Sequence, residues 1–310
     1  MSRPRLLDLF CGAGGAAMGY HRAGFDVVGV DIKPQPNYPF EFVQGDALGW
    51  WLWKDDPSIT VGRCFDAIHA SPPCQAFTSI QAVADNADEH PDLIAPTREL
   101  LEQTGLPYVI ENVIGAPLRE GFRLCGSSFG LGVPSLGREI RRHRMFETNW
   151  PIGLIPQCAH RLPACGIYGD HFRMGRRSSD GEFSGQRAIA YGRAAMHVDW
   201  MQTWDEIKEA IPPAMTEFIG EQLLAHVTSL SSPTVAACAG ERRKHTSISC
   251  STTTARRGLS GTSTGTNATK PGGSVAAPRR PFTAQSTTPS RRSTRTPIPA
   301  PMRAKPKNRA

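Results

Sequence analysis

One cysteine stands where an α/β protein could place a nucleophile. Cys74 follows a short apolar run at residues 65–70 and the pair Pro72-Pro73. Proline fixes φ at about −65° and has no backbone N–H, so this pair must turn the chain out of a sheet. A thiol on a rigid loop at the carboxyl end of a strand suits covalent chemistry. A buried structural cysteine would explain the same segment equally well, because unpaired cysteine is often buried.

Two further sites carry charges that such a thiol would need. Glu111 ends an apolar strand expected at 106–110, so its carboxyl group would reach the same sheet edge and could hold or donate a proton. A structural cap is the alternative. Arg142 and Arg144 are two residues apart, so on a strand their side chains would share one face. A solvated basic edge strand is the alternative there.

A glycine-rich segment precedes all of these residues. A strand at 6–10 leads into Gly12-x-Gly14-x-x-Ala17, a helix is expected at 16–23, and a second strand at 25–31 ends on Asp31. This pattern predicts a nucleotide-cofactor site, in which the carboxylate accepts from ribose hydroxyls. It does not separate a nicotinamide cofactor from S-adenosylmethionine, because both contain adenosine. Asp46 follows a third strand, at 41–44, and could bind an adenine amino group, although Gly-Asp is also a common turn.

The alternation of these strands with helices predicts an α/β fold with a doubly wound, mostly parallel sheet. Further helices are expected at 91–104, 188–201, 204–210 and 214–228. Residues 149–187 are rich in Gly, Pro, Arg and Ser and are expected to be irregular. They contain Cys158, His160, Cys165 and His171, whose spacings match no usual zinc pattern. No metal is therefore expected, and a basic insert that contacts phosphates and bases is favoured.

The charge is divided unevenly along the 310 residues. Residues 1–228 hold 20 Lys and Arg against 27 Asp and Glu, whereas residues 229–310 hold 15 against one. The second segment is dominated by Ser, Thr, Pro and Arg, which predicts disorder. It could bind DNA non-specifically or be dispensable.

The chain has no run of 18 apolar residues and no signal peptide, and its eight cysteines fit reduced thiols, so a cytoplasmic location is expected.

Taken in order, these motifs resemble the DNA (cytosine-5) methyltransferase family in its compact bacterial and phage form, over about residues 5–228. The motifs are Phe10-x-Gly12-x-Gly14, Asp31, Gly45-Asp46, Pro72-Pro73-Cys74-Gln75, Glu111-Asn112-Val113 and Arg142-x-Arg144. The resemblance implies a Rossmann-like fold and an S-adenosylmethionine pocket lined by Phe10, Gly12, Gly14, Asp31, Asp46 and Pro72. It also implies that Cys74 attacks cytosine, that Glu111 contacts the ring nitrogen, and that Arg144, supported by Arg142, contacts the base carbonyl.

The resemblance further implies a division of the chain and its partners. Residues 1–148 would form the cofactor-binding and catalytic domain, 149–187 a short target-recognition insert, 188–228 helices that return to the catalytic domain, and 229–310 a basic tail. Double-stranded DNA is the expected partner of a monomer. A restriction-modification context with a cognate endonuclease is left open, as is a phage origin with action in the host cytoplasm.

Three departures from the family and three rival functions qualify this hypothesis. Ile140 replaces a family glutamine, Ile211-Pro212-Pro213 replaces a Gly-Asn start, and residues 193–196 match the family's Arg-Glu motif only faintly. The rivals are a tRNA cytosine-5 methyltransferase, a DNA-binding protein with little turnover, and a nicotinamide-dependent oxidoreductase. The oxidoreductase leaves the Pro-Pro-Cys-Gln and Glu-Asn-Val motifs unexplained.

Overall fold

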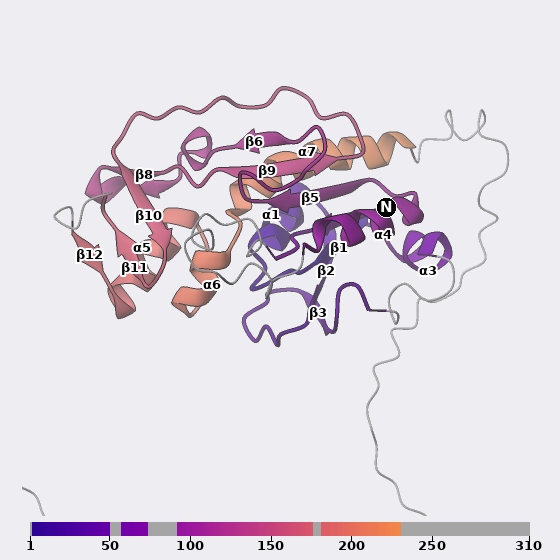
Figure 1. The fold of residues 1–310 in the computed structure, drawn as a ribbon, viewed down its shortest axis with the longest axis horizontal. Coiled ribbons are helices and arrows are strands. Elements are labelled where there is room, and N and C mark those ends of the chain that lie inside the picture. Colours follow the sequence, from indigo (N-terminus) through magenta and orange to yellow (C-terminus); the bar gives the residue numbers. More distant parts are fainter. Residues whose placement is uncertain (1, 50–56, 74–91, 176–180, 231–310) are drawn as a thin grey trace, which may run out of the picture. The chain divides into compact units, whose positions relative to one another are not determined.

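A seven-stranded sheet in the order β3-β2-β1-β4-β5-β9-β6 forms the centre of the fold (Figure 1). Its parallel strands are β1 (Arg5–Leu9), β2 (Asp26–Asp31), β3 (Glu41–Gln44), β4 (Ala67–Ala70) and β5 (Tyr108–Asn112). Strand β9 (Arg144–Thr148) runs antiparallel to both β5 and β6 (Phe122–Leu124). The strand order reverses between β1 and β4, where sheets of this type bind ligands. The predicted doubly wound sheet is confirmed.

This computed structural model describes residues 2–49, 57–73, 92–175 and 181–230. Cys74 and residues 231–310 lie outside the described residues, so the expectations for the nucleophile and for nearly all of the basic tail are not tested. Within the described ranges, no helix is long and apolar enough to cross a membrane.

Helices from both ends of the described chain pack together on the central sheet. Helix α1 (Gly15–Ala23) lies against α7 (Pro213–Leu230), beside which it is drawn in Figure 1. The contact is close because glycines line it. A Cβ added to Gly220 would lie 2.7 Å from that of Ala23, and the Thr216 hydroxyl donates to the Ala16 carbonyl at 2.9 Å. Helices α3 (Pro57–Cys64) and α4 (Ile94–Thr104) also contact each other.

A second, five-stranded sheet has the order β12-β11-β10-β8-β7 (Figure 1). Its strands are β7 (Gly132–Val133), β8 (Arg138–Ile140), β10 (Ala164–Tyr168), β11 (His171–Arg173) and β12 (Glu182–Phe183). The 3₁₀ turns η3 (Gly126–Phe129) and η4 (Pro134–Leu136) precede β7 and β8. Helices α5 (Gly185–Met196) and α6 (Trp204–Glu209) pack against this sheet and share an apolar core with it.

Two expectations for this region are wrong. Residues 164–183 contain strands β10, β11 and β12, although the sequence predicts irregular structure there. These strands have two to five residues, so they are too short to show a clear alternation of apolar and polar side chains. The helix expected at 188–201 spans Gly185–Met196 instead, and it ends at His197, whose φ of 57° is left-handed.

Candidate active site

The carboxyl ends of β4 and β5 bring the Pro-Pro loop and Glu111 to one edge of the central sheet. The two strands are parallel neighbours, with Ala70 opposite Ile110. Glu111 is buried, and its Oε1 lies 2.9 Å from Nε of Arg144 on the adjacent strand β9. Glu111 Oε1 has no well-formed hydrogen bond among the described residues, so this contact is an ion pair. The structure thus joins Glu111 and Arg144, two of the four predicted catalytic residues.

Burial changes the proton affinity of Glu111. Desolvation raises its pKa, while Arg144, then Arg142, and a hydrogen bond from Ser71 lower it, and the result is a raised pKa. A carboxyl group of this kind keeps its proton to higher pH than an exposed glutamate does. Protonated Glu111 could therefore act as a donor of a proton or a hydrogen bond.

Arg142 does not share a face with Arg144, so that expectation is wrong. Strand β9 begins only at Arg144, and Arg142 precedes it with a φ of 24°. Its guanidinium donates to the Ile167 carbonyl at 3.2 Å and to the Lys208 carbonyl at 2.5 Å. Arg142 therefore connects the start of β9 to β10 and α6, and its charge lowers the pKa of Glu111.

Asn112 holds the loop that leads to Cys74. Its side chain is buried, and Nδ2 donates to the Pro72 carbonyl at 2.9 Å. Ile140, at the position of the family glutamine, is buried in the core of the second sheet. Asn112 therefore supports this loop. Its role was not predicted from the sequence, although its position directly after Glu111, at the end of a strand, could have indicated it.

A buried hydrogen-bonded chain connects α1 to Glu111. His69 on β4 lies 2.9 Å through Nδ1 from the Tyr20 hydroxyl and 2.8 Å through Nε2 from the Ser71 hydroxyl. Burial lowers the pKa of His69 to about 3, so its ring is neutral and has one donor and one acceptor. If Tyr20 donates to His69 and His69 donates to Ser71, the Ser71 hydroxyl can donate to Glu111, and both ring nitrogens of His69 are satisfied. A role for His69 was not predicted from the sequence because this residue lies within an apolar run.

The glycine-rich turn after β1 leaves room for a ligand. Phe10 and Gly12 have left-handed φ values of 57° and 49°, and Gly14, with φ 83°, caps α1. A Cβ added to Gly12 would meet no heavy atom within 4 Å, whereas one added to Gly14 would lie 2.8 Å from Pro39 Cδ. Gly12 therefore borders open space, while Gly14 is required by packing.

Two carboxylates stand at the ends of the neighbouring strands β2 and β3. Asp31 accepts from the Gly12 amide at 3.0 Å and from the Lys33 amide at 2.9 Å, so it fixes the glycine turn. Each of its oxygens still has a lone pair for a ligand hydroxyl. Asp46 is exposed and accepts from the Leu48 amide at 2.9 Å. Next to Asp31 stands Ile32, which is 67% exposed and offers an apolar surface that the sequence analysis missed.

The C-terminal segment closes on the same glycine turn. The Trp200 indole donates to the Ala13 carbonyl at 2.9 Å, and the Ile211 backbone packs directly against Gly15. The segment that departs from the family pattern at 211–213 therefore still reaches the start of α1. Trp200 is another residue of this site that the sequence analysis missed.

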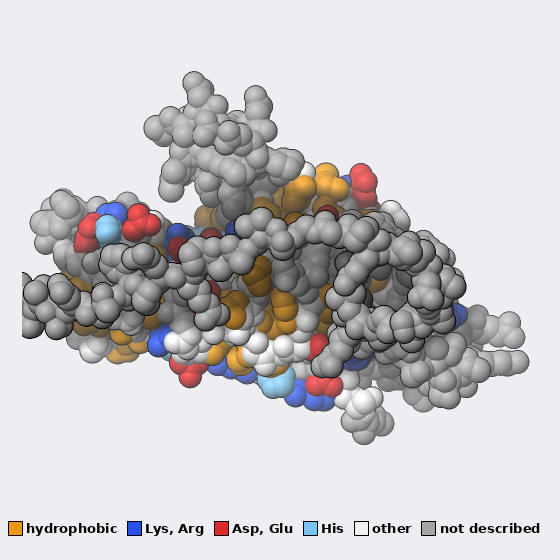
Figure 2. All heavy atoms as spheres, turned by 90° about the horizontal axis from the view of Figure 1, so that it is seen from below, with side chains coloured by type: hydrophobic (Ala, Val, Ile, Leu, Met, Phe, Trp, Pro, Cys, Tyr) orange, Lys and Arg blue, Asp and Glu red, His pale blue; other side chains and the backbone are white. Residues whose placement is uncertain are grey.

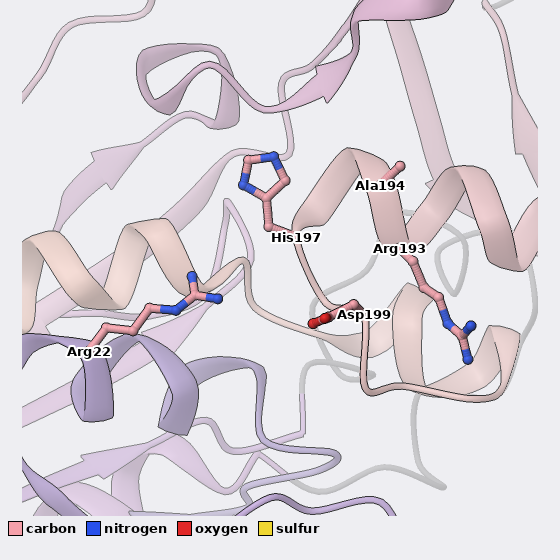
Figure 3. A pocket seen from close by; sticks show the side chains of 5 residues that line it. All are labelled: Arg22, Arg193, Ala194, His197 and Asp199. Carbon is pink, nitrogen blue, oxygen red and sulfur yellow. The ribbon is translucent and has the colours of Figure 1, made fainter.

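A pocket of about 450 Å³ opens between α1 and the end of α5, lined by Arg22, Arg193, Ala194, His197 and Asp199 (Figure 3). Arg193 donates to the Met201 carbonyl and, at 2.6 Å, to Gln202 Oε1, so its guanidinium has a structural role. The pocket shares no lining residue with the site around Glu111.

Residues 4–117 match the family described as C-5 cytosine-specific DNA methylase. The chain is 33% identical over 132 residues to the type II methyltransferase M.XorII of Xanthomonas oryzae pv. oryzae, covering 37% of this chain and 29% of that protein. It is 29% identical over 122 residues to the type II methyltransferase M.AgeI of Thalassovita gelatinovora, covering 36% and 28%. The matches therefore span less than a third of either relative.

Among solved structures, the Entamoeba histolytica methyltransferase EhMeth is similar over 73% of this chain and 99% of that chain. The identity is 11% and the TM-score is 0.44.

Proposed function

We propose that the protein transfers a methyl group to carbon 5 of cytosine in DNA, because residues 4–117 match the C-5 cytosine-specific DNA methylase family. The observation that carries the proposal is the buried pair of Glu111 and Arg144. Cytosine presents an acceptor ring nitrogen next to a carbonyl oxygen. A protonated carboxyl group and a guanidinium 2.9 Å apart match these two acceptors.

Each residue of the site has a role in this proposal. Carbon 5 of cytosine reacts poorly with a methyl donor until a nucleophile adds to carbon 6. The Cys74 thiolate would form that bond, which pushes electron density onto the ring nitrogen and the carbonyl oxygen. Glu111 would then donate its proton or hydrogen bond to the nitrogen, and Arg144 would stabilise the charge on the oxygen. Carbon 5 would then take the methyl group as the donor's sulfur–methyl bond breaks. After the carbon-5 proton has passed to solvent, Cys74 would leave again as the thiolate.

The glycine turn suits S-adenosylmethionine, which would supply an electrophilic methyl group. Gly12 borders open space, Asp31 retains acceptor capacity for ribose hydroxyls, and Ile32 offers an apolar surface to a flat ring. Asp46 would accept a hydrogen bond from the adenine amino group of the cofactor. Phe10, Gly14 and Pro72 would shape the backbone around the cofactor.

Double-stranded DNA would have to release its cytosine from the base stack, because carbon 6 is not accessible to Cys74 within a duplex. We propose that residues 149–187 contact the DNA at this step. The face seen in Figure 2 has acidic side chains among the Lys and Arg side chains. Affinity for DNA would therefore depend on a few local contacts and on the net charge of +14 within residues 229–310.

The test is methyl transfer from labelled S-adenosylmethionine to double-stranded DNA and, separately, to tRNA. We expect label in DNA, no label with Cys74→Ser, and nearly full activity with the matched control Cys165→Ser, since Cys165 lies in the core of the second sheet. Equal labelling by Cys74→Ser would contradict the covalent step. Label in tRNA alone, or DNA binding without any transfer, would replace the proposal by one of the two rival functions.

A further inference from the structure

Two cysteines and two histidines, side chains of the kinds that bind metal ions, lie together outside the site around Glu111. The ligand atoms of Cys125, His143, Cys158 and His160 all lie within 4.8 Å of one another. Cys125 precedes η3, His143 lies between β8 and β9, and the other two lie in the connection from β9 to β10. The sequence predicted no metal because these ligands come from three separate segments, and because Cys165 and His171 were grouped with Cys158 and His160.

Two of the six distances between these ligand atoms match the edges of a coordination tetrahedron, and the other four are no longer than 4.8 Å. Cys125 Sγ lies 3.3 Å from His160 Nε2, and Cys158 Sγ lies 3.5 Å from His143 Nε2. With Zn–S bonds of about 2.3 Å and Zn–N bonds of about 2.0–2.1 Å, the sulfur–nitrogen edge of a tetrahedron measures about 3.5 Å. We propose a closed, structural site for one Zn²⁺ ion, with the ligands Cys125, His143, Cys158 and His160.

The chemistry of the donors selects the metal. Two thiols and two imidazoles, without a carboxylate among them, suit zinc and disfavour magnesium or calcium. Four protein ligands leave no open coordination position, so the ion would be structural rather than catalytic. Burial and neighbouring positive charges lower the pKa of His143, which favours the neutral ring that a metal requires. Burial raises the pKa of the Cys125 thiol, an effect that a bound dication would reverse.

The surroundings support a site that an ion can enter. Cys125 is buried, His143 and Cys158 are half-buried, and His160 is exposed. The Ser127 hydroxyl lies 3.0 Å from Cys125 Sγ and accepts from the Ala159 amide at 3.3 Å, so it links the two loops behind the ligands.

A zinc ion here would order the long connection between β9 and β10. Residues 149–163 contain no helix or strand. Trp150, Ile152 and Ile155 pack against the core, but none of residues 156–163 is buried, so the core contributes little to ordering the part that carries Cys158 and His160. Zinc at Cys158 and His160 would fasten it to the start of η3 and to the turn before β9. His143 lies directly between Arg142 and Arg144, so the ion would also fix the turn that presents Arg144 to Glu111.

Metal analysis of the full chain tests this proposal. We expect one zinc per chain after purification without chelators, and Co²⁺ replacement should give the absorption of a tetrahedral site with two thiolates. Cys158→Ser and His160→Gln should lose most of the metal, whereas the matched controls Cys165→Ser and His171→Gln should retain it. A chain without zinc that also fails to bind Co²⁺, full metal content in both ligand variants, or a Cys125–Cys158 disulfide in freshly purified protein would overturn the proposal.

A measurement on the unaltered protein covers the case in which the variants fail to fold. Removing zinc with a chelator should lower the Tm, and adding Zn²⁺ should restore it. Only the link to Arg144 rests on the proposed function, and the two failures are distinguishable. Zinc-loaded protein that never methylates would contradict the function alone, whereas active protein without zinc would contradict the metal site alone.

Discussion

At the scale of single residues, the site depends on the balance at Glu111. Burial favours the protonated form, while Arg144 at 2.9 Å favours the carboxylate. If the reaction uses protonated Glu111, activity falls as the pH rises through its pKa. The charge of Arg144 therefore sets the upper end of the active pH range.

Variants of the pair should separate the two roles. Glu111→Gln removes the proton donor and should reduce methyl transfer by about 10²–10⁴-fold. Arg144→Gln removes the charge that lowers the Glu111 pKa, so transfer should weaken and its alkaline limb should move to higher pH. The profile of kcat/KM against pH measures both effects. Arg119→Gln, at an exposed ion pair with Glu102, is the control, and an alkaline limb that stays in place in Arg144→Gln would refute this account.

Asp8 on β1 is a second buried carboxyl group, and it weakens the fold at neutral pH. It is 0% exposed and has no well-formed hydrogen bond within the described ranges. Burial first, and then the negative charge of Asp31, raises its pKa, although the Tyr38 hydroxyl lowers it somewhat. Because the folded pKa exceeds the unfolded one, the stability that this group contributes is present at low pH and is lost as the pH rises through the folded pKa.

Asp8→Asn should therefore raise the Tm at pH 7 and leave it nearly unchanged at pH 4, where the native carboxyl group is protonated. The free energy of unfolding at pH 7 should rise by about 1.4 kcal/mol for each unit by which the folded pKa of Asp8 exceeds the unfolded one. Thermal unfolding at the two pH values measures it. Asp26→Asn, an exposed substitution on the neighbouring strand, is the control. An equal shift at both pH values would show that charge is not the cause.

At the scale of elements, a buried ion pair fixes the strand that carries Arg144. Arg98 on α4 holds both carboxylate oxygens of Glu147 on β9 at 2.7 Å, and the two side chains are only 6% and 3% exposed. The Arg119 amide and the Pro117 carbonyl complete the network. A pair this buried mainly specifies how β9 joins the sheet, since the cost of desolvation offsets much of its attraction.

Removing one partner of this ion pair should lower the free energy of unfolding substantially. Glu147→Gln leaves the buried Arg98 charge without its counter-ion and should destabilise the fold by about 3–5 kcal/mol in urea unfolding. Glu102→Gln, in an exposed pair with Arg119, should change stability by less than about 1 kcal/mol. The double variant Arg98→Met/Glu147→Leu should recover much of the loss. Similar losses for Glu147→Gln and Glu102→Gln would contradict the assignment.

At the scale of the whole molecule, the basic C-terminal segment should affect DNA affinity rather than turnover. It carries 15 Lys and Arg against one acidic residue. Deleting residues 231–310 should leave methyl transfer at saturating DNA unchanged. It should weaken binding at low salt and flatten the dependence of affinity on salt, because fewer counterions are released. A segment of equal length with its Lys and Arg changed to Gln is the control, and unaltered salt dependence in both variants would remove the segment from the binding model.

The parallel sheet was predictable because its strands carry local patterns. Apolar runs, the glycine turn and the acidic residues at strand ends all lie within short windows of sequence. The second sheet was not predictable, since it depends on long-range pairing such as that of Ile140 with Cys165. Asn112 with Pro72, and Cys125 with His160, are likewise contacts between distant segments. The proposed roles of the site residues, with Cys74 foremost, stay predictions.

The hydrogen-bonded chain from Tyr20 through His69 and Ser71 to Glu111 has a consequence for how two bound ligands would change each other's affinity. Tyr20 belongs to α1, the helix that the glycine turn begins, so a ligand that moves this helix also changes how strongly Ser71 bonds to Glu111. Occupancy of the proposed methyl-donor pocket and the proton affinity of Glu111 would then be thermodynamically linked. Because linkage is reciprocal, a cytosine bound at Glu111 would change the affinity for the donor by the same factor.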